Sequence, residues 1–232
     1  MPPPVERMVD AAVEAWCLDL DAAVADLDRC LAMLDEEERA RADRFRVARD
    51  RDRYILRRGL LRERLAHRLG RAPARIRYIQ NAWGKPSLEV GDLRFNLSHS
   101  RGLALCVIAH REVGCDIEWR NPQLAVEPIA ERFFSARELA ALRALDRARW
   151  ARAFFNAWTR KEAYIKARGR GLSLALDSFD VSLAPDEPAA LLRGCDGWSV
   201  RAFEPAPGYH AAVVAEGTDW QLLLDPLSTA AL

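Results

Sequence analysis

The stretch Gly102-Leu-Ala-Leu-Cys-Val-Ile-Ala109 runs from a glycine through unbroken apolar residues to an alanine. Such a run is typical of a strand that is buried on both faces. The stretch Gly208-Tyr-His-Ala-Ala-Val-Val-Ala215 repeats this outline with the same spacing in the second half of the chain. Since any two buried strands look alike, the likeness indicates a duplication only if the surrounding elements also repeat.

The elements predicted around the first stretch come in the order strand, long helix, strands. Alternating apolar residues predict a strand over residues 13–20. Asp35 and Glu38 have capping-box spacing and begin a proline-free helical pattern. We expect one long helix that ends at Gly70, with a candidate kink near Gly59. Three further strands are predicted at residues 75–79, 93–97 and 103–109.

The second half of the chain repeats this order. A strand is predicted over residues 113–119, then helices at 127–145 and 150–168 and strands at 179–183, 198–203 and 210–215. The echo and the matching order together predict an α+β fold of two similar halves, residues 1–112 and 113–232. Each half should be a small antiparallel sheet packed on a long helix.

Composition excludes several classes of protein. Half of the 232 residues are hydrophobic, but no apolar run approaches the roughly 20 residues of a membrane span. The opening residues 1–7 lack the basic start and apolar block of a secretory signal, which predicts a soluble, cytoplasmic protein. The five cysteines are scattered without a CxxC pair, as buried apolar residues are. A net charge of +1 gives no global argument for nucleic acid.

Basic residues are distributed unevenly. Of the 35 lysines and arginines only Lys85, Lys161 and Lys166 are lysine, and each lies in a short motif. An ammonium differs in geometry from a guanidinium, so this favours sites that need lysine; chance under an arginine-rich codon bias is the alternative. Fifteen arginines lie between Arg39 and Arg77. Most should pair with interleaved acidic residues, and one or two should bind phosphate.

Two carboxylates lie two positions apart in Gly114-Cys-Asp-Ile-Glu118. In a strand this spacing points Asp116 and Glu118 to one face, where their charges repel. A hard cation with oxygen ligands, typically Mg²⁺, would hold such a pair together. The alternative is a solvated acidic face on an edge strand.

Charged residues interrupt an apolar helical stripe in Phe154-Phe-Asn-Ala-Trp-Thr-Arg-Lys-Glu-Ala-Tyr-Ile-Lys166. Lys161 falls on the stripe with Glu162 beside it, and Lys166 follows one turn after Glu162. Charges that border a core require partners, and the glycines after this helix let backbone approach a ligand. The alternative is an ordinary surface pair between Glu162 and Lys166.

The segment Asn96-Leu-Ser-His-Ser100, followed by Arg101 and Gly102, is expected to form a tight turn between two strands. Two hydroxyls, an imidazole and free backbone amides in such a turn suit a phosphate group. A serine hydrolase is not favoured, because the chain lacks the nucleophile elbow G-x-S-x-G.

Four motifs occur in one order and spacing: Gly84-Lys-Pro86, Phe95-Asn-Leu-Ser-His-Ser100, Gly114-Cys-Asp-Ile-Glu118 and Trp158-Thr-Arg-Lys-Glu-Ala-Tyr-Ile-Lys166. In combination they resemble the 4′-phosphopantetheinyl transferase superfamily, surfactin-synthetase-activating (Sfp) type. The resemblance implies a pseudo-twofold fold with one active site between the halves. It also implies Mg²⁺-dependent transfer of the phosphopantetheine arm of coenzyme A to a serine of an apo acyl or peptidyl carrier protein. Adenosine 3′,5′-bisphosphate would be the by-product.

By motif position, the resemblance assigns roles to individual residues. Mg²⁺ would be held by Asp116, Glu118 and Glu162, and the catalytic residues would be Glu162, Asp116 and Lys166. Coenzyme A would be bound by Arg41, Arg53, Lys85, Ser98, His99, Asp116, Lys161 and Lys166. In this set Lys161 and Lys166 neutralise phosphate charge, Lys85 lies beside the nucleotide, and Arg41 and Arg53 are candidates for the 3′-phosphate. Glu162 is the expected base for the serine proton, with Asp116 acting through a metal-bound water as the alternative.

Two other functions stay open at this point. The same three carboxylates would serve an Mg²⁺-dependent phosphodiesterase or nucleotidyl hydrolase, and a non-catalytic coenzyme A-binding module is the third hypothesis. Residues 120–134 would offer a carrier protein a hydrophobic dock, or would simply pack on the core. A chain that supplies both sides of the site should act as a monomer, without nucleic acid or membrane partners.

Overall fold

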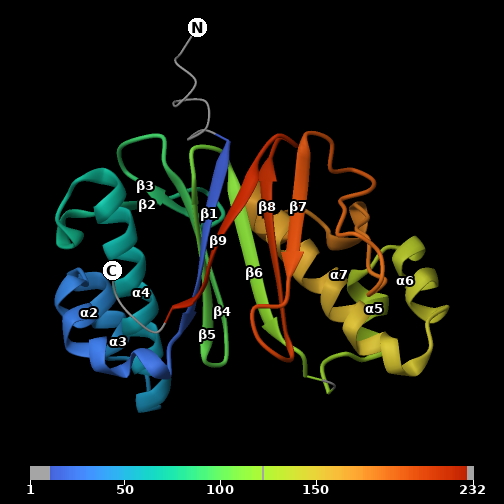
Figure 1. The fold of residues 1–232 in the computed structure, drawn as a ribbon, viewed down its shortest axis with the longest axis horizontal. Coiled ribbons are helices and arrows are strands. Elements are labelled where there is room, and N and C mark those ends of the chain that lie inside the picture. The colour runs from blue at the N-terminus through green and yellow to red at the C-terminus, as the bar shows by residue number, and fades with distance from the viewer. Residues whose placement is uncertain (1–10, 122, 229–232) are drawn as a thin grey trace, which may run out of the picture.

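A computed structural model of the chain describes residues 11–121 and 123–228. Two sheets pack face to face in the middle of the molecule, and helices cover the outer face of each sheet (Figure 1). The four layers are therefore helix, sheet, sheet and helix. This arrangement confirms the predicted α+β fold of two halves, each with a sheet packed against a long helix.

The elements follow the chain in two sets. The first set is β1 (Ala12–Asp19), α2 (Leu27–Met33), α3 (Glu36–Ala42), α4 (Ala48–Leu69), β2 (Tyr78–Gln80), β3 (Pro86–Leu88), β4 (Arg94–Ser100) and β5 (Leu103–Ala109). The second set is β6 (Val113–Trp119), α5 (Glu127–Phe133), α6 (Ala136–Arg143), α7 (Arg147–Arg168), β7 (Trp198–Phe203), β8 (Tyr209–Glu216) and β9 (Gln221–Ser228). Short 3₁₀ helices lie at Ala22–Asp26, Pro73–Arg75, Gly171–Ser173 and Leu176–Ser178.

The strands form one sheet in each half and a small separate ribbon. The first sheet has the order β4-β5-β1-β9, the second has the order β6-β8-β7, and β2 pairs with β3. The stretches that echo each other in sequence are β5 and β8, and each has a neighbouring strand on both sides. Strand β9, which no sequence pattern predicted, runs parallel to β1. The first sheet is therefore mixed, which corrects the expectation of a purely antiparallel sheet.

Three apolar clusters fill the spaces between the layers. Leu105 and Val107 of β5 face the second sheet, whereas Cys106 and Ile108 face α4, as the alternation of a strand requires. The cluster between the second sheet and α7 includes Phe154. In the part of the chain that the structure describes, no helix is both long and apolar enough to cross a membrane.

The helix predicted from Asp35 to Gly70 is divided into α3 and α4, which corrects the prediction. Both of its ends are as expected. Asp35 and Glu38 form a capping box, and Gly70 ends α4 in the left-handed region with φ 59°. Between these ends the chain leaves the helical conformation after Ala42 and begins a new helix at Ala48.

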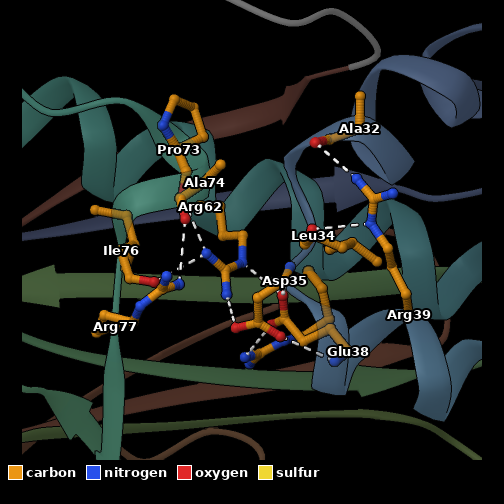
Figure 2. A network of polar contacts seen from close by, with 11 residues as sticks. Ala32, Leu34, Asp35, Glu38, Arg39, Arg62, Pro73, Ala74, Ile76 and Arg77 are labelled. Atoms are coloured by element: carbon orange, nitrogen blue, oxygen red, sulfur yellow. Dashed lines mark hydrogen bonds and ion pairs between the residues drawn. The ribbon is translucent and has the colours of Figure 1, made fainter.

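A buried ion network explains this break (Figure 2). The side chain of Arg62 is fully buried and donates to Glu38 at 2.5 Å, to Asp35, and to the carbonyl oxygens of Pro73 and Ile76 at 3.0 Å each. A buried guanidinium needs such acceptors, and α3 supplies two of them only by turning back along α4. No proline or glycine marks the break, so no local signal predicted it.

Two further predictions in the second half need correction. The helix predicted over residues 127–145 is divided into α5 and α6 by Ser135, which forms a capping box with Glu138. This Ser-x-x-Glu spacing is a helix-start signal inside the predicted helix. The strand predicted over residues 179–183 is only an isolated bridge between Val181 and Leu191.

Candidate active site

Strand β4 meets the open edge of β6 through its side chains rather than its backbone. Three alternate side chains of β4 accept hydrogen bonds from three alternate N–H groups of β6: Asn96 from Cys115 (2.9 Å), Ser98 from Ile117 (3.4 Å) and Ser100 from Trp119 (3.0 Å). Each pair is 19 residues apart, so the two strands run in the same direction. This polar ladder joins the halves and satisfies backbone donors that would otherwise be unpaired.

The tight turn predicted over Asn96 to Ser100 is therefore wrong. These residues continue β4, and the turn follows at Arg101 and Gly102, where Arg101 has a positive φ of 52°. The period-two spacing of Asn96, Ser98 and Ser100 is a signal for a strand with one polar face. This spacing is a sequence signal for the contacts that Asn96 and Ser100 make with β6, which the predicted turn did not include.

Gly114 allows helix α7 to lie directly on β6. A Cβ at Gly114 would come within 2.2 Å of the backbone nitrogen of Ala167 and 2.4 Å of the carbonyl oxygen of Ala163. Side chains at these two helix positions are small, so helix and strand make close contact. Since α7 carries Glu162 and Lys166 one turn apart, this contact brings both over the acidic face of β6.

Lys166 and Asp116 form the centre of the site. Lys166 Nζ donates to Asp116 Oδ1 at 2.6 Å and to Ser98 Oγ at 3.0 Å, and Ser98 Oγ donates to the same Asp116 oxygen at 2.8 Å. An ammonium has three N–H groups, so one N–H of Lys166 remains for a ligand. Asp116 Oδ2 is buried and has no hydrogen-bond partner among the described residues.

Two further carboxylates are affected by the charge of Asp116. Burial, followed by that charge, raises the pKa of Glu118 to about 7, although a hydrogen bond from Ser100 at 2.8 Å opposes the shift. The same two causes raise the pKa of Glu162, which makes no hydrogen bond or ion pair within residues 11–121 and 123–228. The cluster therefore holds three carboxylates and one ammonium, with an excess of negative charge.

These carboxylate oxygens are suitable ligands for a hard divalent cation. The unpartnered oxygen of Asp116 needs a ligand, and carboxylates that repel each other gain from a positive charge between them. In the described part of the chain, no three His, Cys, Asp or Glu side chains are arranged as a complete set of metal ligands. Mg²⁺ does not need such a cage, because it uses one or two protein carboxylates and takes other oxygens from water and phosphate.

Lys161 is not part of this cluster, which corrects the prediction. Its ammonium is buried and donates to Glu138 at 2.7 Å and to the carbonyl oxygens of Leu176 and Phe179 at 2.7 Å each. All three N–H groups are used, so none is left for a phosphate. The sequence placed Lys161 next to Glu162 but could not show that Glu138, on α6, is its partner.

Lys85, which is predicted to lie beside the nucleotide, likewise has its ammonium fully engaged within the protein. Its ammonium donates to Glu112 at 2.8 Å, to the carbonyl oxygen of Val113 at 3.2 Å and to that of Ala167 at 2.8 Å. Only 12% of the side chain is exposed. Lys85 therefore fastens the β2–β3 turn of the first half to β6 and to the end of α7.

His99 lies at the border of the cluster. Loss of solvation, together with the positive charges of Arg57, Lys166 and Arg53, lowers the pKa of His99 to about 4. The imidazole is therefore neutral near pH 7 and lies among cations.

The two arginines predicted to bind a phosphate have different surroundings. Arg53 makes two hydrogen bonds to Asp21, at 2.7 and 2.6 Å. Arg41 is exposed, and its guanidinium lies 5.7 Å from the centre of the Tyr54 ring. Arg57, which sequence analysis did not single out, has a larger effect on the pKa of His99 than Arg53 has.

A groove of about 670 Å³ opens where the halves meet. Both halves line it, with Asp19, Asp21, Arg49, Arg53, Arg101, Gly102 and Leu103 from the first and Ala206 and Tyr209 from the second. The guanidinium of Arg101 lies 3.1 Å from the centre of the Trp119 ring, and Trp119 directly follows Glu118 in β6. The groove therefore reaches the end of the strand that carries the acidic cluster.

Two family models match successive parts of the chain. Residues 21–112 match the N-terminal family of 4′-phosphopantetheinyl transferases, and residues 112–214 match the 4′-phosphopantetheinyl transferase superfamily. The chain is 38% identical over 226 residues to the 4′-phosphopantetheinyl transferase HetI of Nostoc sp., across 94% of this chain and 94% of that protein. The chain belongs to the 4′-phosphopantetheinyl transferase superfamily.

This transferase is also 32% identical over 207 residues to the 4′-phosphopantetheinyl transferase Sfp of Bacillus subtilis, across 88% of this chain and 91% of that protein. A solved holo-(acyl-carrier-protein) synthase from Bacillus anthracis in complex with CoA matches 46% of this chain and 96% of that chain. That match has 20% sequence identity and a TM-score of 0.40. The chain is thus an enzyme that transfers 4′-phosphopantetheine from coenzyme A to a carrier protein, rather than a phosphodiesterase or a non-catalytic module.

Proposed function

We propose that the transferase reaction takes place at the junction of the two halves, in the cluster of Asp116, Glu118, Glu162 and Lys166. One observation carries this proposal: three groups with unused binding capacity meet there. They are the unpartnered Oδ2 of Asp116, the third N–H of Lys166 and the free carboxylate of Glu162. Buried polar groups without partners are costly, so a ligand is expected to supply the partners.

Asp116 and Glu118 are the proposed ligands of Mg²⁺, and Glu162 would be the third carboxylate beside the ion. When bound, Mg²⁺ would neutralise negative charge on the diphosphate of coenzyme A and on the leaving phosphate. Ser98 and Ser100 hold the two ligands in place, since each hydroxyl donates to one carboxylate at 2.8 Å. Ser98 therefore acts on the diphosphate through Asp116 and Lys166.

Glu162 is the proposed base. In the transfer, the serine oxygen of the carrier protein bonds to the phosphorus that carries the pantetheine arm. The bond from that phosphorus to the bridging oxygen breaks, and the electron pair leaves with adenosine 3′,5′-bisphosphate. Glu162 takes the serine proton. A free carboxylate with a raised pKa suits this role better than Asp116, whose charge is already used by Lys166.

Lys166 would place its remaining N–H on the diphosphate. Its side chain is 30% exposed, so a ligand can approach it from solvent. The contact would strengthen as negative charge builds up on the leaving phosphate, which makes it worth more in the transition state than in the ground state. His99 would border the nucleotide part of coenzyme A.

The proposed dock for the carrier protein is the segment that follows β6. Leu124 and Val126 are 53% and 37% exposed, directly after the strand that carries the metal ligands. Phe134 is buried, and the half-buried Phe133 packs against Trp158, so these two rings belong to the core instead. Because residues of one chain complete the site, we also propose that the enzyme works as a monomer.

The proposal is tested by incubating the protein with coenzyme A, Mg²⁺ and an apo carrier protein and weighing the carrier by mass spectrometry. Glu162→Gln and Asp116→Ala should each lower the rate by at least about 100-fold. Glu89→Gln, on an exposed loop, is the matched control and should react as wild type does. Near-normal rates for Glu162→Gln or Asp116→Ala, with an active control, would refute the assigned roles.

A further inference from the structure

Arg101, in the turn between β4 and β5, has an unusual backbone conformation. Its φ is 52°, and among residues 11–121 and 123–228 it is the only residue other than glycine with a positive φ. This left-handed region is unfavourable for a residue that has a Cβ, whereas a glycine adopts it without strain. A strained arginine at such a position therefore indicates that its side chain has a use.

The side chain of Arg101 stacks on Trp119 across the junction of the two halves. Its guanidinium lies 3.1 Å from the centre of the Trp119 ring, and it makes no hydrogen bond or ion pair with the described residues. Trp119 is the last residue of β6, and this end of β6 lies at the same end of the molecule as the β4–β5 turn (Figure 1). The stack therefore joins the first half to the end of the strand that carries Asp116 and Glu118.

The end of β6 is held less firmly than the rest of the strand. In the described part of the chain β6 pairs by its backbone with β8 alone, so its other side depends on the polar ladder from β4. The hydrogen bonds of Asn96 and Ser98 in this ladder are buried, whereas the one from the Trp119 N–H to Ser100 Oγ is only partly buried. Water competes for a hydrogen bond that it can reach, so this last bond benefits most from a second contact.

The same hydrogen bond affects a proposed metal ligand. Ser100 Oγ accepts from the Trp119 N–H at 3.0 Å and donates to Glu118 Oε2 at 2.8 Å. Because one hydroxyl makes both bonds, a shift of Trp119 away from Ser100 would also release the carboxylate of Glu118. Hydrogen bonds of this kind orient the ligands of a metal ion and strengthen its binding.

The turn that carries Arg101 is itself supported by the first half. A Cβ at the next residue, Gly102, would come within 2.7 Å of Asp21 Oδ2, so the turn lies directly on this carboxylate. Asp21 in turn accepts two hydrogen bonds from Arg53, at 2.7 and 2.6 Å. Since the turn rests on an ion pair, Arg101 can hold the end of β6 rather than move with it.

We propose that Arg101 and Trp119 are positioning residues that hold Glu118 in place for Mg²⁺. This inference rests on the proposed function of the cluster. Without the stack the end of β6 would move more freely, and the metal ion would lose a ligand that is already oriented. A pure charge effect acts in the opposite direction, because removal of a positive charge near carboxylates favours a cation there. The sign of the change in metal affinity therefore separates positioning from charge.

The experiment measures binding of Mn²⁺, a paramagnetic probe for the Mg²⁺ site, by electron paramagnetic resonance. The protein is saturated with coenzyme A, and no carrier protein is present. Arg101→Gly should weaken Mn²⁺ binding by about 3- to 10-fold, the range expected for loss of a cation–π contact. Trp119→Leu removes the same stack without a change in charge and should have the same effect. The double variant should be no weaker than either single variant, since both changes break one contact.

Two further variants and a stability measurement complete the test. Arg101→Lys keeps a cation over the ring and should keep most of the affinity. Arg71→Gly, which removes an exposed arginine from the turn after α4, should bind Mn²⁺ as wild type does. Because Arg101→Gly relieves the strained φ, its midpoint of urea unfolding should not fall.

Unchanged or tighter Mn²⁺ binding by Arg101→Gly would overturn the proposal, and so would additive effects in the double variant. Weaker binding together with a lower urea midpoint in Arg101→Gly would also overturn it, because that result indicates a general structural role. Failure of wild type to bind Mn²⁺ would instead contradict the metal site of the proposed function, and the role of Arg101 with it.

Discussion

The three lysines of the chain differ in how many N–H groups they have free. Lys85 and Lys161 each donate three hydrogen bonds or ion pairs within the protein, whereas Lys166 donates two. An ammonium that is fully used in the protein cannot bind a phosphate without first breaking a contact. Lys166 is thus the one lysine with an N–H group left to bind a ligand.

Arginine substitutions should separate Lys166 from Lys161. Lys166→Arg keeps a charge beside Asp116 but changes donor geometry, so the turnover rate should fall by about 10- to 100-fold with little change in stability. Lys161→Arg places a larger group in a buried space, so the free energy of unfolding should fall by about 1–3 kcal/mol. The measurements are the transfer rate per folded molecule and urea unfolding. If Lys161→Arg lost turnover but kept its stability, Lys161 would belong to the site after all.

The contact between β6 and α7 determines the site at the scale of elements. Gly114 leaves the space for it, and the hydrogen bonds from Ser98 and Ser100 fix the side chains on the strand. Glycine is needed at position 114 because a Cβ there would meet backbone atoms of the helix. Backbone atoms, unlike the end of a flexible side chain, cannot rotate away to make room. The position of Glu162 and Lys166 therefore depends on a residue that has no side chain.

The substitution Gly114→Ala should displace α7 from β6. Its Cβ would meet the backbone atoms of Ala167 and Ala163 at 2.2 and 2.4 Å, so the helix must move. We expect a loss of about 1–3 kcal/mol in the free energy of unfolding. The transfer rate should fall by about 100-fold, since an error of about 1 Å in position has such effects. Urea unfolding and the carrier assay check both numbers, and wild-type values in both would contradict this account of Gly114.

The motifs in the sequence predicted the elements of the site better than its contacts. The strand over residues 113–119 and the helix with Glu162 were predicted from periodicity, and both are present. The contacts of Lys161 and Lys85 were not predictable, because Glu138 lies far from Lys161 in the chain, and Glu112 and Ala167 lie far from Lys85. Local sequence patterns predict helices, strands and helix caps. They do not predict which side chains far apart in the chain will pair.

The whole molecule depends on how its two halves are joined. Besides the ladder between β4 and β6, the β2–β3 turn reaches across to the end of α7. There Asn81 donates to the carbonyl oxygen of Gly169 at 2.7 Å, and Lys85 donates to that of Ala167 at 2.8 Å. The carbonyl groups at a helix C-terminus lack helical partners, so these side chains cap α7 from the other half.

Removing this cap should affect stability more than substrate binding. Lys85→Met leaves Glu112 with one partner, Arg94, and two carbonyl groups without the ammonium. We expect the free energy of unfolding to fall by about 1–3 kcal/mol, with little change in coenzyme A affinity. Urea unfolding and calorimetry measure the two quantities. Unchanged stability combined with weaker coenzyme A binding would show that Lys85 acts in nucleotide binding rather than in stability.

The stability of the whole molecule should fall in mild acid because of His210. This side chain is 3% exposed, and its Nδ1 donates to Asn156 Oδ1 at 3.0 Å, while Nε2 is buried without a partner among the described residues. Loss of solvation is the first cause that lowers the pKa of His210, from its ordinary value of 6.5 to about 4. A proton on Nε2 would be a buried charge without an acceptor.

The direction of the effect follows from the two pKa values. Above pH 6.5 His210 is neutral in both states and contributes nothing, whereas between pH 6.5 and 4 the unfolded chain binds a proton that the folded chain does not. Over this interval the lowered pKa should cost about 3 kcal/mol of unfolding free energy. His210→Gln removes the titrating group, so urea unfolding from pH 7 to pH 4 should show a flatter loss than in wild type. His67→Gln, exposed on α4, should follow the wild-type curve. Parallel curves for His210→Gln and wild type would show that His210 does not limit stability in acid.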